Sequence, residues 1–202
     1  MIRRPPRSTR KESSAASDVY KRQIDESRGH FSIECNDTPS KLIGGETNGW
    51  ELYESIINQA AVLFSFEQIG GSQASLDMSI NYAKERYAFG RPIGSFQAIK
   101  HKLADMYVAL TLAKSNSYYA AWALSTESSD LPTASATARV SATKAFQLCS
   151  KENIQTHGGN GYTWEYDCHL FYKRSKLLSV NIGSLSNWKE KLVSSLEQSN
   201  IN

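Results

Sequence analysis

The residues best suited to binding a ligand lie in a short charged and aromatic stretch near the middle of the chain. This stretch, residues 85–97, reads ERYAFGRPIGSFQ, and Arg86, Phe89 and Gln97 are its candidate contacts. A guanidinium group is planar and always charged, so it can donate paired hydrogen bonds to a pyrophosphate. An arginine at a helix end can also simply pair with a carboxylate. The stretch alone does not decide between these two uses of Arg86.

A second candidate segment is rich in glycine and lies further along the chain. Residues 155–165 read QTHGGNGYTWE, and Gln155, Gly158 and Gly159 are its candidate contacts. Because glycine has no Cβ, the backbone at these positions can come close to a ligand. The segment is not a dinucleotide-binding fingerprint, since no strand precedes it and the G-x-G-x-x-G spacing is absent. Taken alone, such a run is more often the end of a helix.

The elements that must position these segments are helices, because apolar residues recur at three- and four-residue spacing. The spacing predicts long helices over residues 50–86, 96–125 and 132–157, then shorter ones over 166–180 and 185–198. Ile56 and Leu63 are among the apolar positions of the first helix, and the third has a narrow face of small residues that permits close approach to a neighbour: Ala138, Ala142, Ala145 and Cys149. Gly90 is expected to close the first helix as a left-handed residue, and Ser95 to be the N-cap of the second. The sequence therefore predicts an all-α fold, an up-and-down bundle of the four-helix type.

The part of the chain before the bundle reads as a short β remnant followed by a linker. The residues FSIEC, from Phe31 to Cys35, alternate in polarity as a strand does. One strand has no independent stability, so we expect it to be the remnant of a larger sheet. The expected division is a remnant and linker over residues 24–49 and a helical domain over residues 50–202.

Residues 1–23 differ in composition from the rest of the chain. They read MIRRPPRSTRKESSAASDVYKRQ, with seven basic and two acidic side chains, a net charge of +5. Since the whole chain has a net charge of +3, the remaining residues have a net charge of −2. The segment shows neither helical nor strand periodicity. It resembles translated sequencing-adapter sequence, and we expect a disordered leader of artefactual origin. A natural disordered tail is the second interpretation and an organellar transit peptide the third.

Composition excludes several classes of function for the predicted bundle. Its net negative charge gives no basis for a nucleic-acid site, and no apolar run approaches the ~18 residues of a membrane span. The three cysteines are scattered and form no C-x-x-C pair, which favours reduced thiols. The four histidines have no ligand spacing with other residues, so no metal site is predicted.

The two candidate segments, in this order and at this separation, resemble the C-terminal helical domain of the acyl-CoA dehydrogenases. The resemblance covers about residues 31–199. The family's middle β-domain is reduced to a remnant and its N-terminal domain is absent. The resemblance implies FAD as cofactor, with Arg86 on the pyrophosphate of the neighbouring subunit's FAD, Phe89 beside the cofactor and Gln97 at its adenosine portion. It implies that Gln155, Gly158 and Gly159 contact the adenine end.

The resemblance also implies where a catalytic carboxylate should lie, and this chain has none there. The two positions at which family members carry the base that removes the substrate's α-proton are occupied by Ile182 and Ala60. Neither side chain can accept a proton. Glu67, further along the first helix, is an alternative, although a solvated or ion-paired glutamate is the preferred interpretation. No catalytic residue is therefore assigned to this chain.

Three hypotheses follow for the function. The first is a fragment or non-catalytic subunit of an FAD-dependent acyl-CoA dehydrogenase, acting in fatty-acid or steroid side-chain oxidation as a homo- or hetero-oligomer. The resemblance then implies an acyl-CoA substrate and electron-transfer flavoprotein as acceptor, in bacterial cytoplasm or the mitochondrial matrix. The second is a flavin-dependent monooxygenase subunit of the same fold. The third is a helical assembly module without catalysis.

Overall fold

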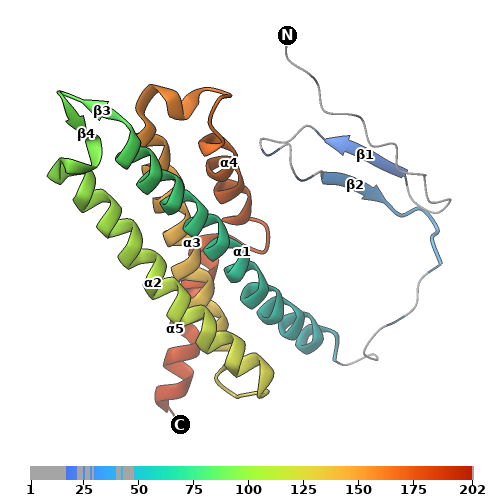
Figure 1. The fold of residues 1–202 in the computed structure, drawn as a ribbon. Helices are drawn as coiled ribbons and strands as arrows, with labels where there is room; N and C mark the ends of the chain where they lie inside the picture. Colours follow the sequence, from blue (N-terminus) through green and yellow to red (C-terminus); the bar gives the residue numbers. More distant parts are fainter. Residues whose placement is uncertain are drawn as a thin grey trace.

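The chain forms a bundle of long helices with a small pair of strands to one side (Figure 1). The computed structural model describes residues 17–21, 25, 28, 30–39, 42 and 48–201. The three long helices are α1 (Gly49–Glu85), α2 (Gln97–Ser125) and α3 (Leu131–His157). They alternate in direction along the bundle, and the shorter α4 (Cys168–Leu178) and α5 (Leu185–Ile201) follow. The predicted all-α up-and-down fold is confirmed.

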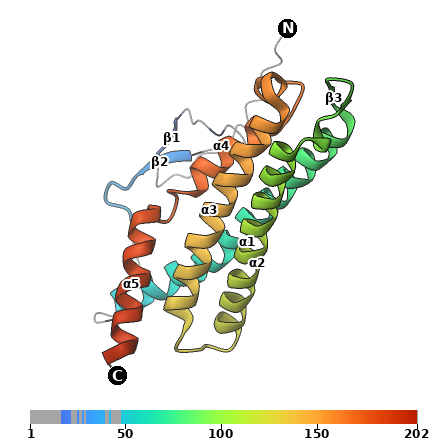
Figure 2. The same ribbon diagram turned by 90° about the vertical axis from the view of Figure 1, so that its left-hand side faces the viewer.

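Helix α3 is the centre of the bundle, since it packs against all four of the other helices (Figure 2). Its inward face carries small side chains, and the four that the sequence predicts there are all buried: Ala138, Ala142, Ala145 and Cys149. Small side chains let neighbouring helix axes approach closely. The core around them is completed by Leu76 of α1 with Met106 and Leu110 of α2.

The buried face of α1 differs from the predicted one. Ile56 and Leu63, expected in the core, are 53% and 67% exposed. The buried face is instead largely polar, with these members: Asn58, Ser65, Gln68, Ser72, Ser75 and Ser79. Each hydroxyl has a partner within reach; Ser72, for example, donates to the Gln68 carbonyl at 2.7 Å. Buried polar groups are tolerated when they are hydrogen-bonded, so polarity alone mispredicts which face of α1 is buried.

Two of these polar residues join α1 directly to α3. The Gln68 side-chain amide donates to the Thr143 hydroxyl at 3.0 Å, and the Ser135 hydroxyl donates to the side-chain Oδ1 of Asn58 at 3.2 Å. Close approach of the same two helices depends on Gly71, because a Cβ there would lie 2.3 Å from the Phe146 ring. These contacts set the register of α1 on α3.

The connection between α1 and α2 is a small β-hairpin, which corrects the sequence prediction. α1 ends at Glu85, and β3 (Tyr87–Ala88) pairs with β4 (Arg91–Pro92). Phe89 and Gly90 form the loop, with φ of 53° and 78°, and positive φ at both central residues is the pattern of a tight hairpin turn. Gly90 is left-handed as expected, but it closes the hairpin rather than the helix.

Ser95 does not cap α2 as predicted. A short 3-10 helix, η1 (Ile93–Ser95), follows the hairpin, and α2 begins at Gln97 with Phe96 as its N-cap residue. The Ser95 hydroxyl donates back to the Pro92 carbonyl at 2.7 Å. Since that hydroxyl closes the preceding turn, it is not used at the start of α2.

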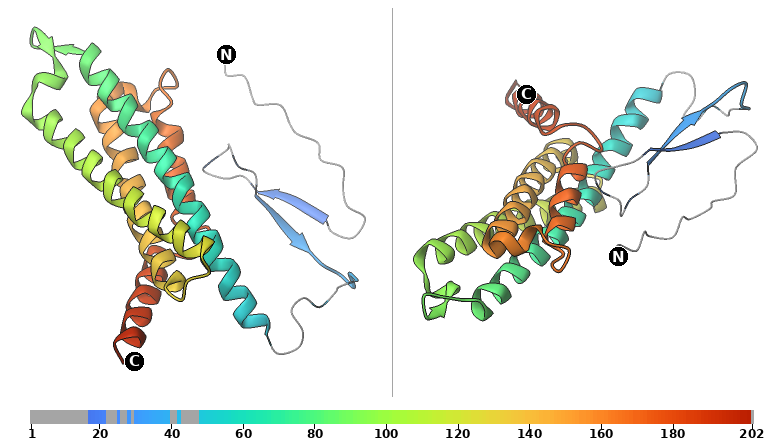
Figure 3. Two further views of the ribbon diagram at one scale, coloured as in Figure 1. Left: turned by 60° about the horizontal axis from the view of Figure 1, so that its bottom comes forward. Right: turned by 90° about the horizontal axis from the view of Figure 1, so that it is seen from above.

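The strand pair confirms one expected strand and adds one that the sequence does not predict. β2 (His30–Glu34) is the expected strand, and it pairs antiparallel with β1 (Ser17–Lys21). β1 falls within residues 1–23, where no regular structure is expected; the other residues of that segment lie outside the described part. Figure 3 shows the two strands beside the bundle. Among the described residues no helix is both long and apolar enough to cross a membrane.

Candidate functional site

The candidate site is a shallow cavity of about 260 Å³ at the hairpin end of the bundle, where α1 and α3 both terminate. The end of α1 contributes Arg86, and the turn after α3 contributes Gly158 and Gly159. The remaining lining residues are Tyr82, Ile93, Thr156, His157 and Asn160. The two segments singled out in the sequence are thus brought to one place by the antiparallel packing of α1 and α3.

Arg86 is held firmly through its backbone while its side chain is available. Its N–H donates to the Tyr82 carbonyl at 2.9 Å, and its carbonyl accepts from the Ile93 N–H at 2.8 Å. These two bonds end α1 and start the hairpin at a defined point. The guanidinium is exposed and pairs with no carboxylate in the part of the chain that the structure describes. The ion-pair alternative for Arg86 is therefore not realised there.

The glycines after α3 have two distinct functions. Gly158 has φ of 60° and ends the helix, and neither Gly158 nor Gly159 has a heavy atom near the position of a Cβ. Their backbone therefore lies open along the cavity. Gly161 instead faces inward, since a Cβ there would lie 2.7 Å from the Ile154 carbonyl oxygen. The first two glycines leave room for a ligand, and Gly161 is needed for packing.

An aromatic contact that the sequence analysis missed joins the two sides of the cavity. The rings of Tyr82 and His157 stack with centroids 4.1 Å apart, and Tyr166 lies edge-on to both. Asn160 donates to the Tyr82 hydroxyl at 3.0 Å. The signal in the sequence was positional: Tyr82 lies one helical turn before Arg86, and His157 directly precedes the glycines.

His157 is set up as a neutral ring whose outer nitrogen is available. Burial lowers its pKa, while the hydrogen bond to the Asn153 carbonyl works in the opposite direction. That bond, 2.9 Å long, engages Nδ1, so in the neutral ring Nδ1 carries the proton and Nε2 is an acceptor. Nε2 has no hydrogen-bond partner among the described residues, and it is not fully buried. The cavity therefore presents both a cationic donor, Arg86, and a neutral acceptor.

The other predicted contacts do not line this cavity. Phe89 is 97% exposed at the tip of the hairpin, where its ring meets Phe96 edge-on. Gln97 is exposed at the first turn of α2, and Gln155 is exposed on α3. A ligand that reached all of them would have to extend over the hairpin, beyond the cavity itself.

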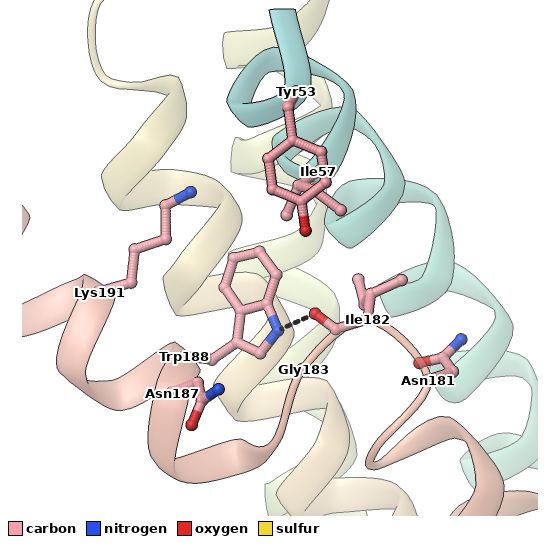
Figure 4. A pocket seen from close by; sticks show the side chains of 8 residues that line it. All are labelled: Tyr53, Ile57, Asn181, Ile182, Gly183, Asn187, Trp188 and Lys191. Atoms are coloured by element: carbon pink, nitrogen blue, oxygen red, sulfur yellow. Dashed lines mark hydrogen bonds between the residues drawn. The ribbon is translucent and has the colours of Figure 1, made fainter. Parts of the chain in front are cut away.

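The position expected for a catalytic base borders a different cavity, of about 380 Å³, at the other end of α1 (Figure 4). Ile182 lies on the turn between α4 and α5, and its carbonyl accepts from the Trp188 indole N–H at 3.1 Å. The lining residues are Tyr53, Ile57, Asn181, Ile182, Gly183, Asn187, Trp188 and Lys191. Among these described residues Lys191 alone is charged, so they supply no carboxylate base.

Glu67, the alternative base, is occupied in ion pairs. Its carboxylate accepts from Arg174 at 2.7 Å and from Arg28 at 3.1 Å. Ala60 is half-buried on α1 one residue before the core residue Ala61. The structure thus agrees with the preferred interpretation of Glu67. No group of three or more His, Cys, Asp or Glu side chains within the described ranges could hold a metal ion.

Comparison with known proteins identifies the domain type. The family model described as acyl-CoA dehydrogenase, C-terminal domain, matches residues 47–185. Acyl-CoA dehydrogenase IpdE2 of Mycobacterium tuberculosis is 45% identical over 120 residues, which cover 59% of this chain and 36% of that protein. The family match runs from just before α1 to the first residue of α5.

Solved structures show the same fold. Butyryl-CoA dehydrogenase from Megasphaera elsdenii superposes with a TM-score of 0.86 at 21% identity, over 91% of this chain and 49% of that one. The ChsE4-ChsE5 complex from Mycobacterium tuberculosis superposes with a TM-score of 0.79 at 22% identity, over 91% of this chain and 50% of the matched one. The chain therefore spans half or less of the length of these relatives.

Proposed function

Because the chain belongs to the acyl-CoA dehydrogenase family, we propose that it is the helical part of an FAD-dependent acyl-CoA dehydrogenase subunit and holds part of the FAD bound to a neighbouring subunit. The observation that carries the proposal is the shared cavity of Arg86, Gly158 and Gly159. A guanidinium that pairs with no described carboxylate can donate paired hydrogen bonds to a pyrophosphate, and the open glycine backbone leaves room for one.

The size of the cavity limits which part of FAD it can receive. At about 260 Å³ it lies below the ~300–1,000 Å³ of sites that enclose a whole ligand. It suits the pyrophosphate and adenosine portion, with the flavin ring held elsewhere. Arg86 would offset part of the phosphate charge, and His157 Nε2 would accept a hydrogen bond from a hydroxyl or amino group. When bound, FAD supplies the hydride acceptor for α,β-dehydrogenation of an acyl-CoA thioester.

The missing base indicates how this chain would take part in such a reaction. Ile182 and Ala60 cannot take the substrate's α-proton, and Glu67 is paired. We therefore assign the chain a non-catalytic role in a complex whose other subunit supplies the carboxylate. The relative described as the ChsE4-ChsE5 complex supports an assembly of two different chains. The acyl-CoA substrate and an electron-transfer flavoprotein as acceptor belong to this proposal.

The outer face of α2 supports a subunit contact. Tyr107, Tyr118 and Trp122 are spaced eleven and four residues apart, so they share one side of the helix, and all are exposed large side chains. Leu112 and Val108 extend this surface. Aromatic side chains are enriched where proteins associate. Light scattering should therefore show a smaller assembly for Tyr118→Glu than for the unaltered chain.

The cofactor proposal is tested by flavin content. The chain is co-expressed with an acyl-CoA dehydrogenase subunit that retains its β-domain, and bound flavin is measured by absorbance for each purified complex. Arg86→Ala should weaken flavin retention about tenfold or more, because a hydrogen bond to a charged group contributes ~1.5–3 kcal/mol. Arg91→Ala is the matched control, since Arg91 lies on the same hairpin but stacks on Phe96, 4.1 Å from the ring centroid.

The outcomes separate the dehydrogenase proposal from a purely structural role. Loss of flavin in Arg86→Ala with normal assembly supports the cofactor contact. If Arg86→Ala assembles normally and retains as much flavin as Arg91→Ala, the chain is an assembly module and the proposed FAD contact is wrong.

A further inference from the structure

A chain of four alternating charges connects the segment before the bundle to the bundle itself. Arg174 of α4 donates through Nε to Asp25 Oδ2 at 2.5 Å and through Nη1 to Glu67 Oε1 at 2.7 Å. Glu67 of α1 also accepts from Arg28 Nη2, at 3.1 and 3.3 Å for its two oxygens. The order of contact is therefore Asp25, Arg174, Glu67, Arg28.

The two halves of this network come from different parts of the chain. Glu67 and Arg174 lie on neighbouring helices, α1 and α4, which pack on each other and on α3. Asp25 and Arg28 are three residues apart in the preceding segment. The bundle thus presents one acidic and one basic side chain next to each other. The segment presents a side chain of opposite charge to each of them, Arg28 to Glu67 and Asp25 to Arg174.

Burial makes these contacts stronger than ordinary surface ion pairs. Asp25 is only 3% exposed, and the Arg174 and Glu67 side chains are 24% and 30% exposed. A buried carboxylate is stable only when it is paired, and partly buried charges are screened less by salt than exposed ones. The pair with Arg174 therefore offsets the cost of burying the Asp25 carboxylate when the segment docks.

We propose that Glu67 and Arg174 form a docking socket by which the bundle holds Asp25 and Arg28 of the segment that precedes it. The socket fixes where the polypeptide arrives on the α1–α4 side, the side on which β1 and β2 lie in Figure 1. It also gives the Glu67 carboxylate a structural role, in place of the proton abstraction considered for it above. The inference does not depend on flavin binding.

The socket has a second connection inside the bundle. Arg139 of α3 is 1% exposed, and its charge interacts with that of Glu67. Arg139 donates to the Leu178 carbonyl and, at 2.8 Å, to Asn181 Oδ1 on the turn after α4. Glu67 is therefore paired with Arg28 and Arg174, and the charge of Arg139 on α3 acts on it without a direct ion pair among the described residues. Removing its charge should loosen the segment without removing any apolar contact of the core.

The test uses trypsin cleavage after Arg28 in the full chain, because trypsin must release that side chain from Glu67 to cut. Glu67→Gln and Asp25→Asn should each speed this cleavage about tenfold, the factor expected for losing a charge-assisted contact. Added salt should speed cleavage of the unaltered chain more than that of Glu67→Gln. Glu152→Gln is the control, since it breaks a comparable pair, Lys102–Glu152, elsewhere in the bundle.

Two results would overturn the socket. One is an unchanged rate of cleavage after Arg28 in both Asp25→Asn and Glu67→Gln. The other is equal acceleration in Glu152→Gln, which would indicate general destabilisation. Asp25→Asn lies outside the bundle, so it keeps the test valid even if Glu67→Gln lowers the stability of the helices. Flavin content plays no part in either readout, so the socket and the proposed cofactor contact can fail independently.

Discussion

The stacked rings of Tyr82 and His157, 4.1 Å apart between centroids, place the end of α1 against the end of α3. Arg86 follows Tyr82 by one helical turn, and Gly158 follows His157 directly. The stack therefore sets the separation of the guanidinium from the open glycine backbone. The cavity therefore depends on this contact between distant residues as well as on the antiparallel packing of α1 and α3.

Replacing Tyr82 should weaken the bundle at its hairpin end. Tyr82→Leu removes the ring stack, for which aromatic pairs gain ~0.5–1.5 kcal/mol, and the hydrogen bond from Asn160, for which the net value is ~0.5–1.5 kcal/mol. Urea unfolding should show a free energy lower by ~1–3 kcal/mol. Tyr87→Leu, at an exposed tyrosine of the hairpin, is the control and should change little; equal effects would contradict the importance of the stack.

Stability should depend on pH through His157. Burial lowers its pKa in the folded state below the usual 6.5. As pH falls below ~6.5 the unfolded chain binds a proton that the folded chain binds only at lower pH, so the unfolding free energy decreases, by at most ~1.4 kcal/mol per pH unit. Above that pH the contribution is complete.

Urea unfolding at about pH 7 and about pH 5.5 checks this dependence. The ring is faced by Tyr82, Tyr166 and the Arg86 charge that shares its cavity. His157→Phe should reduce the decrease in stability between the two pH values, and the exposed His101→Gln should leave it unchanged. An unaltered slope in His157→Phe would assign the pH dependence to other groups.

Replacing each of two adjacent glycines in α1 by alanine should change the unfolding free energy in opposite directions. Gly71→Ala places a Cβ into the Phe146 ring and should lower the unfolding free energy by ~1–3 kcal/mol through overpacking. Gly70→Ala meets no atom within 4 Å and should raise it by ~0.5–1 kcal/mol, because alanine loses less backbone entropy in a helix. Thermal unfolding of both variants measures the difference; the same sign for both would mean that α1 is rotated on α3.

Only one of the three thiols should react quickly in the folded protein. Burial raises the pKa of Cys149 to about 12 and that of Cys168 to about 11, whereas Cys35 is exposed. The thiolate is the reactive form. An aromatic disulfide reagent at about pH 8 should therefore modify one thiol in the native chain and all three in denaturant. Rapid modification of two in the native chain would show that α3 or α4 opens readily.

The sequence by itself determined the helices, because helix periodicity and glycine-marked ends are local properties. The boundaries of the three long helices and the buried small-residue face of α3 follow from spacing alone. The lack of a carboxylate at positions 60 and 182 is likewise a matter of residue identity. Membership of the family was visible in the two motifs around Arg86 and Gly158, which the family model confirms.

Only the tertiary structure decided which face of α1 is buried and which candidates meet. Serines of α1 are buried because hydrogen-bond partners lie within reach, on its own turns and on α3, which no polarity pattern contains. The hairpin directs Phe89 outward while Arg86 stays beside the glycines. Glu67 became an ion-pair partner because α4 brings Arg174 to it. Each of these outcomes depends on contacts between distant residues, and such contacts exist only after the helices have packed.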